Sequence, residues 1–214
     1  MPRPIVIAYH LIWTAYGWWL PNDPRGSTSR RVASDVLAEL GELHYGRRKI
    51  QPPRRVVREF YDRAGEVLKF ALLELSAADV QAVAEGFSDA IARERYTCYA
   101  CAILPDHVHV LIRKHKHQAE QMIEVLQSAS RLRLSTLGLR TPDHPVWATG
   151  GWKVFLDHPD AVRQRTHYIE QNPIKHRLPA QCWSFVKPYD GWPFHRGHSP
   201  NSPYVKRSLL DSAE

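Results

Sequence analysis

Apolar and polar residues along the chain follow patterns that predict four strands. Residues 4–14, 96–104 and 107–113 are rich in β-branched and aromatic side chains and are bounded by turn-forming residues. Only two residues separate the second run from the third, which predicts a tight antiparallel hairpin. A shorter apolar run at 152–156 predicts a fourth strand.

Apolar residues at a spacing of three and four predict the helices. Three of them are expected at 54–67, 76–94 and 118–137. A further helix is expected to begin at residue 157 or 159 and to end at Asn172. Pro173 should stop it, because proline lacks a backbone N–H and clashes with the preceding turn.

Strands and helices in this order predict an α+β fold, with a ferredoxin-like antiparallel sheet and helices packed on its faces. The main domain is expected to span residues 1–178. Within it, a loop rich in Pro and Gly at 17–27 leads into a largely polar insertion at about 28–51. Residues 179–214 predict a C-terminal arm and tail rich in Trp and Pro.

The composition is that of an ordinary globular protein, with 43% hydrophobic and 24% charged residues, which excludes wholesale disorder. No apolar run approaches the ~20 residues that cross a bilayer, and the first residues lack a secretory signal, so a cytoplasmic protein is expected. Cys98 and Cys101 lie three apart in a predicted strand. That spacing places their thiols on opposite faces and favours buried cysteines over a metal-ligand pair.

The charge balance favours a polyanionic partner, because 29 Lys and Arg residues face 22 Asp and Glu residues and give a formal charge of +7. Six basic residues fall within twelve positions that contain no acid: Arg47, Arg48, Lys49, Arg54, Arg55 and Arg58. Such a run is often only solvated surface. The functional alternative is a patch that contacts DNA phosphates.

The loop before the insertion has a proline framework that is expected to leave Asn22, Asp23 and Arg25 as polar tips. Amide, carboxylate and guanidinium groups are those that read base edges, so these side chains are predicted DNA contacts. The alternative is that Asp23 and Arg25 pair with each other and hold the loop closed.

Two histidines alternate on the strand at 107–113. In a strand, His107 and His109 point to the same face with Cα atoms about 6 to 7 Å apart, so both imidazoles can reach one metal ion. Paired core or surface histidines explain the pattern equally well. A histidine-triad hydrolase would need a third histidine where the sequence has Leu111.

Tyr168 and Asn172 lie four residues apart in the last predicted helix, and therefore on one face of it. A helical tyrosine is usually a packing residue, but beside an amide and a histidine pair it suits attack on a DNA phosphodiester. A divalent cation held by the histidines and the amide would neutralise the phosphate and stabilise the leaving oxygen. Arg165 or His167 could assist deprotonation of the tyrosine.

The order of His107, His109, Tyr168 and Asn172 resembles that of the HUH single-tyrosine transposases. Residues 10–26 resemble the REP-associated tyrosine transposase branch of that family. The resemblance covers most of the chain from residue 5 to residue 178.

This resemblance implies a metal-dependent endonuclease of single-stranded DNA, with Tyr168 as the nucleophile that forms a 5′-phosphotyrosine link. It implies that His107, His109 and Asn172 bind Mg²⁺ or Mn²⁺. The implied partner is single-stranded DNA with foldback hairpins formed from palindromic repeats. The protein is expected to act as a monomer or a homodimer and to bind no membrane. Arg165 joins the basic residues above as a predicted DNA contact.

Two other hypotheses stay open: a domesticated protein that binds DNA hairpins without cleaving them, and a metal-dependent hydrolase in which the tyrosine is incidental. Tryptophan side chains could also stack on unpaired bases, although core packing is the commoner role. The candidates are Trp18, Trp19, Trp152, Trp183 and Trp192.

Overall fold

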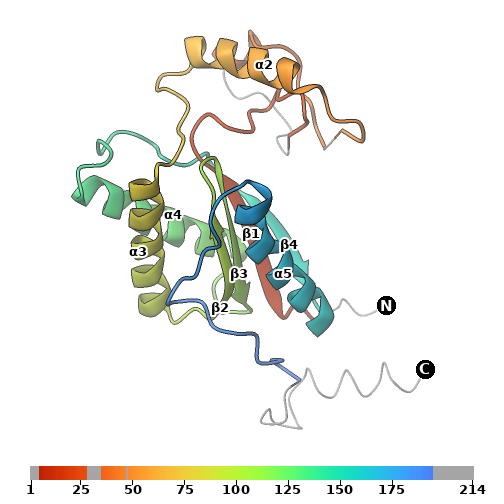
Figure 1. The fold of residues 1–214 in the computed structure, drawn as a ribbon, viewed down its shortest axis with the longest axis vertical. Helices are drawn as coiled ribbons and strands as arrows, with labels where there is room; N and C mark the ends of the chain where they lie inside the picture. The colour runs from red at the N-terminus through yellow and green to blue at the C-terminus, as the bar shows by residue number, and fades with distance from the viewer. Residues whose placement is uncertain (1–4, 28–34, 47, 195–214) are drawn as a thin grey trace.

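The computed structural model describes residues 5–27, 35–46 and 48–194 (Figure 1). In chain order, the elements are β1 (Ala8–Thr14), α1 (Asp35–Ala38), α2 (Arg54–Val67), α3 (Ala77–Glu94), β2 (Cys98–Ile103), β3 (His107–Arg113), α4 (Ala119–Thr136), β4 (Trp152–Leu156) and α5 (Pro159–Lys175). The four predicted strands and the long predicted helices are therefore all present.

The strands form one antiparallel sheet in the order β2-β3-β1-β4, which confirms the predicted α+β fold with ferredoxin-like connectivity. β1 is central, and its register is fixed on both sides: Ile12 lies opposite His109 of β3 and opposite Trp152 of β4. Residues directly opposite in a sheet share a face, so these three side chains form one row.

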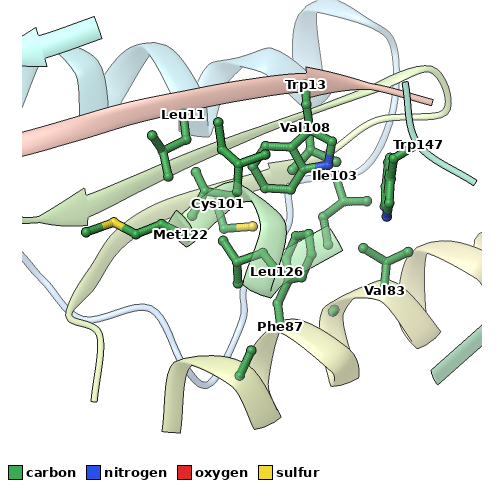
Figure 2. Close-up of a cluster of buried hydrophobic side chains, with 14 of the residues drawn as sticks. Leu11, Trp13, Val83, Phe87, Cys101, Ile103, Val108, Met122, Leu126 and Trp147 are labelled. Carbon is green, nitrogen blue, oxygen red and sulfur yellow. The ribbon is translucent and has the colours of Figure 1, made fainter. Parts of the chain in front are cut away.

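Helices cover both faces of the sheet (Figure 1). α3 and α4 pack on one face, where Leu11 and Trp13 of β1 join Phe87 and Leu126 in the main hydrophobic core (Figure 2). α5 covers the other face, where Ile169 packs on a second, smaller cluster. The alternation of side chains along each strand therefore divides the residues of the sheet between a core face and the face beneath α5.

The insertion and α2 build a separate small cluster on the loop after β1. Leu20 and Leu40 pack there with Phe60, Tyr61 and Ala64 of α2. At the opposite end of the chain, residues 181–187 line the outer edge of β2, where the Gln181 amide bonds both backbone groups of Ile103. In the part of the chain that the structure describes, no helix is long and apolar enough to span a membrane.

Two sequence expectations are wrong in detail. α5 continues through Pro173 to Lys175, because a proline in the last turn removes only one hydrogen bond and the Asn172 carbonyl still accepts from the His176 N–H. Cys98 and Cys101 were expected on opposite faces, but both lie in the main core, since a bulge between Cys98 and Ala100 shifts the register. Both thiols are buried, and burial raises the pKa of each.

α3 and α4 approach closely at Gly86. A Cβ at this position would lie 2.7 Å from the Ser130 Cα and 2.9 Å from the Ala129 carbonyl oxygen, both of which are backbone atoms of α4. Because backbone cannot move aside as a flexible side chain can, Gly86 is required for the packing of the two helices.

Gly86→Ala is therefore expected to lower the free energy of unfolding by about 1 to 3 kcal/mol, despite the better helix propensity of alanine. Gly65 of α2 is the matched control, because a Cβ there meets nothing within 4 Å. Gly65→Ala should raise stability by up to ~1 kcal/mol. Urea denaturation measures both, and equal effects of the two substitutions would contradict this account.

Candidate functional site

Three histidines converge on the sheet face that α5 covers. His107 and His109 alternate on β3, and His10 lies on the adjacent β1, displaced by two residues from the position opposite His109. The His10 and His109 side chains are almost fully buried, at 1% and 5% exposure. His107 and His109 therefore lie side by side, as predicted, and His10 adds a third imidazole from the neighbouring strand.

Hydrogen bonds fix the orientation of these rings. The His10 Nε2 and His109 Nδ1 atoms lie 2.9 Å apart, and the His107 Nδ1 lies 2.6 Å from an Asp106 carboxylate oxygen. The His107 and His109 ring centroids are 4.9 Å apart. Each imidazole of the pair therefore has its Nδ1 engaged, which leaves Nε2 as its free ligand atom.

Burial sets the charge of this cluster. It lowers the pKa of His10 to about 4, with a smaller contribution from the Arg165 guanidinium. Burial, followed by the charge of His107, lowers the pKa of His109 to about 2. Both imidazoles are neutral at pH 7, which is the form that binds metal ions. Burial opposes ionisation of Asp106, but its bond to His107 lowers the carboxyl pKa overall.

α5 carries a stripe of residues along this cluster, one per turn. The Tyr168 ring centroid lies 5.7 Å from that of His109 and 6.1 Å from that of His10. Two turns further on, the His176 ring lies 5.8 Å from that of His107. Asn172 is one turn from each, so the stripe places it between these two contacts.

Asn172 and Tyr168 differ in exposure in a way that suits different roles. The Asn172 side chain is 5% exposed, and its Nδ2 is buried without a hydrogen-bond partner among the described residues. An amide can rotate to present its oxygen at the same place. Tyr168 is 38% exposed, so its hydroxyl can meet a ligand from solvent.

Two cations flank the tyrosine. The Arg165 guanidinium carbon lies 5.7 Å from the ring centroid of Tyr168, and the Lys175 ammonium lies 5.2 Å from it. Arg165 lies one turn before Tyr168 on α5, and Lys175 lies two turns after it. A phosphate that approaches Tyr168 would therefore meet two nearby positive charges.

The donor types collected here are ones that bind divalent metal ions. Among the described residues, no group of three His, Cys, Asp or Glu side chains is arranged to hold one. The available donors are instead the Nε2 atoms of His107 and His109 and the amide of Asn172. Imidazole and amide oxygen together suit Mn²⁺ and similar ions, and the unpartnered amide of Asn172 is a polar group that such an ion would satisfy.

The expectation that Asn22, Asp23 and Arg25 stand as polar tips is wrong for Asn22 and Asp23. Asn22 is 2% exposed and donates to the Leu37 carbonyl oxygen, and Asp23 is 0% exposed. The Asp23 carboxylate accepts from the Arg25 guanidinium and from the Tyr61 hydroxyl. Because these polar groups bond within the protein, they close the loop, which is the alternative stated above, and Asn22 and Asp23 cannot reach DNA bases.

Most of the predicted basic run lies on the surface. Arg48, Lys49, Arg54, Arg55 and Arg58 are exposed, while Arg47 lies outside the described residues.

A cavity of about 790 Å³ lies beside α2. Arg25, Arg54, Arg58 and Arg140 line it, together with Trp18 and Tyr61. The first turn of α2 carries no acid, so its arginines face the positive end of the helix dipole. Positive side chains at this end of a helix lower the free energy of unfolding unless an anion lies nearby.

His10, Asp106 and His176 also belong to the site, although they were not predicted from the sequence. Asp106 directly precedes His107, and His176 continues the four-residue spacing from Asn172, so both could have been found from local spacing. His10 depends on the register of β1 against β3, and the only hint was a histidine in an otherwise apolar strand.

Comparisons with known proteins show a likeness of structure only. No family model matches the chain, and no curated protein matches its sequence. One similar solved structure is a REP-associated tyrosine transposase bound to a REP hairpin, with 13% identity and a TM-score of 0.44 over 91% of this chain and 79% of that one. Another is a candidate transposase from Deinococcus radiodurans R1, with 14% identity and a TM-score of 0.37 over 84% of this chain and 97% of that one.

The buried pair of Asp23 and Arg25 predicts a stability effect. Arg25→Ala should lower the free energy of unfolding by about 3 kcal/mol, because it leaves the carboxylate of Asp23 buried with only the Tyr61 hydroxyl and a backbone N–H as donors. Arg54→Ala, at an exposed position, should change it by less than ~0.5 kcal/mol. Urea denaturation distinguishes them, and an Arg25 variant as stable as the Arg54 variant would show that the pair does not hold the loop.

Proposed function

We propose that the protein is a metal-dependent endonuclease of single-stranded DNA, which cleaves and rejoins strands next to hairpins in the manner of a tyrosine transposase. The observation that carries this proposal is the position of Tyr168. Its half-exposed ring lies within 6 Å of His109, and a buried, unpartnered amide follows one turn later on the same helix. A nucleophile, two imidazoles and an amide are thus collected at one site.

The reaction follows from these groups. The Tyr168 oxygen attacks the phosphorus, an O–P bond forms, and the bond from phosphorus to the 3′ oxygen breaks. The products are a 5′-phosphotyrosine link and a free 3′ hydroxyl. The tyrosine releases its proton during the attack, and the departing 3′ oxygen takes one up. Rejoining is the same exchange in reverse, with a 3′ hydroxyl as the attacking group.

His107, His109 and Asn172 would hold Mg²⁺ or Mn²⁺. When bound, the ion supplies positive charge that neutralises the phosphate and stabilises the leaving oxygen. For His109 to present Nε2, its Nδ1 must carry the proton and donate it to His10 Nε2. In the same way, His107 donates Nδ1–H to Asp106. The Asp106 carboxylate can only accept, so it selects this tautomer of His107, while the His10 ring accommodates the same tautomer of His109 by accepting at Nε2.

Charge on the surface supports DNA as the substrate. Arg165 and Lys175 stand beside the nucleophile, and Arg54 and Arg58 line the cavity beside α2. Guanidinium groups bind phosphates as bidentate donors. These residues would position the phosphates of a strand.

The decisive experiment incubates the protein with a labelled hairpin oligonucleotide that carries single-stranded flanks, in the presence of Mn²⁺. Denaturing gels then separate the hypotheses. A covalent protein–DNA adduct supports the proposal. Tight binding without cleavage would instead indicate a hairpin-binding protein, and cleavage without an adduct would indicate a hydrolase that activates water.

Tyr168→Phe should abolish the adduct while hairpin affinity stays within about threefold, because the change removes one hydroxyl and leaves the phosphate contacts. Tyr45→Phe, which alters an exposed tyrosine of the insertion, should form the adduct at the wild-type rate. Residual adduct in the Tyr168 variant would assign the nucleophile to another residue.

His107→Ala and His109→Ala should each remove Mn²⁺-dependent cleavage. Asn172→Ala should weaken it less and recover at higher Mn²⁺ concentration, because water can replace a neutral oxygen donor. His115 and His117 form a second pair with the same spacing outside the sheet, so His115→Ala is the matched control and should cleave normally. Equal Mn²⁺ titrations for wild type and His109→Ala would refute the metal site.

A further inference from the structure

Trp152 is an exposed aromatic residue on the face of the sheet that carries the candidate site. It is the first residue of β4, lies opposite Ile12 of β1, and is 50% exposed. Ile12 in turn lies opposite His109. Since strands are spaced about 4.8 Å apart, Trp152 lies two strands, or about 10 Å, from His109 in one row.

The alternation along β4 confirms which face Trp152 occupies. Val154 and Leu156, two and four residues on, belong to the cluster beneath α5. Phe155 points to the opposite face, where its ring lies 5.7 Å from that of Tyr9. Trp152 therefore shares the face of the three histidines, but α5 leaves its side chain open to solvent.

Core packing does not account for Trp152. The core tryptophans Trp13 and Trp147 are 2% and 5% exposed, whereas half of the Trp152 side chain faces water. A large exposed aromatic surface beside a candidate active site is a place where a flat apolar ligand can bind. Unpaired bases are such ligands, and every base presents a face for stacking.

The charged residues beside Tyr168 and the distance to Trp152 indicate which base of a DNA strand could reach the indole. Arg165 and Lys175 flank Tyr168 and attract a phosphate to it, so the strand's backbone runs past the nucleophile. The ~10 Å between His109 and Trp152 corresponds to about three stacked nucleotide steps of 3.4 Å, or fewer in an extended strand. A base within a few nucleotides of the reacting phosphate therefore reaches the indole.

We infer that Trp152 is a stacking platform for one unpaired base of single-stranded DNA, close to the phosphodiester that Tyr168 attacks. This inference rests on the proposed function. The contact with Trp152 would make the protein bind an unpaired flank more tightly than a duplex. A paired base is already stacked between its neighbours and does not present its face to the indole.

The test measures binding of a hairpin with a single-stranded flank in EDTA, so that cleavage does not interfere. Trp152→Ala should weaken binding about 5- to 150-fold, which is the range that base–aromatic stacking supplies. Trp152→Phe should recover most of the loss. Phe155→Ala is the matched control, because it removes an aromatic side chain of similar exposure, 57% against 50%, from the opposite face of the same strand. The affinity of this variant for the hairpin should stay within about twofold of the wild type.

Abasic sites, placed in turn along the flank, identify the base. An abasic site at one position of the flank should weaken DNA binding by the wild type but not by Trp152→Ala. The base and the indole make one shared contact, so removing both costs no more than removing either. Additive losses at every position, or equal losses for the Trp152 and Phe155 variants, would overturn the platform. If the wild type forms the Tyr168 adduct but Trp152→Ala binds the hairpin as tightly as the wild type, the stacking platform is overturned and the proposed function stands. A wild type that neither binds nor forms an adduct overturns both proposals.

Discussion

The antiparallel pairing of β1 with β3 is the constraint on which the other features depend. Its register sets His10 beside His109 and at the same time points Leu11 and Trp13 into the main core. A slip of one residue would exchange the two faces of β1. Apolar burial beneath α3 and α4 opposes such a slip, so the packing of the core holds the polar cluster in place.

The polar face is costly by itself, and α5 makes it possible. Two imidazoles buried within one cluster lose their hydration, and hydrogen bonding compensates this only in part, because His10 Nδ1 has no partner among the described residues. Ile169 anchors α5 on the second cluster. Tyr168 directly precedes it and contacts the histidine rings, and Asn172 follows it by about one turn. The same helix therefore covers the polar groups and supplies the two remaining members of the site.

Local patterns in the sequence predict most of the fold and half of the site. Strand alternation places His107 with His109, and helical spacing places Tyr168 with Asn172, because both pairs depend only on backbone geometry. Contacts between distant segments could not be predicted in this way. The position of His10 needs the register of two strands, and the burial of Asp23 needs Tyr61, which lies 38 residues further on.

The loop after β1 links the basic surface of α2 to the hairpin that carries the histidines. The Asp106 carbonyl accepts from the Ala15 N–H, and the Pro105 carbonyl accepts from the Leu75 N–H, so the hairpin is bonded to both ends of this region. Trp18, which lines the cavity beside α2, donates its indole N–H to the Leu73 carbonyl. A side-chain bond and two backbone bonds thus connect the wall of the cavity with the turn before His107. Because these bonds tie the cavity wall to the turn before His107, the fold itself, and not the loop alone, sets where the arginines of α2 lie relative to the candidate site.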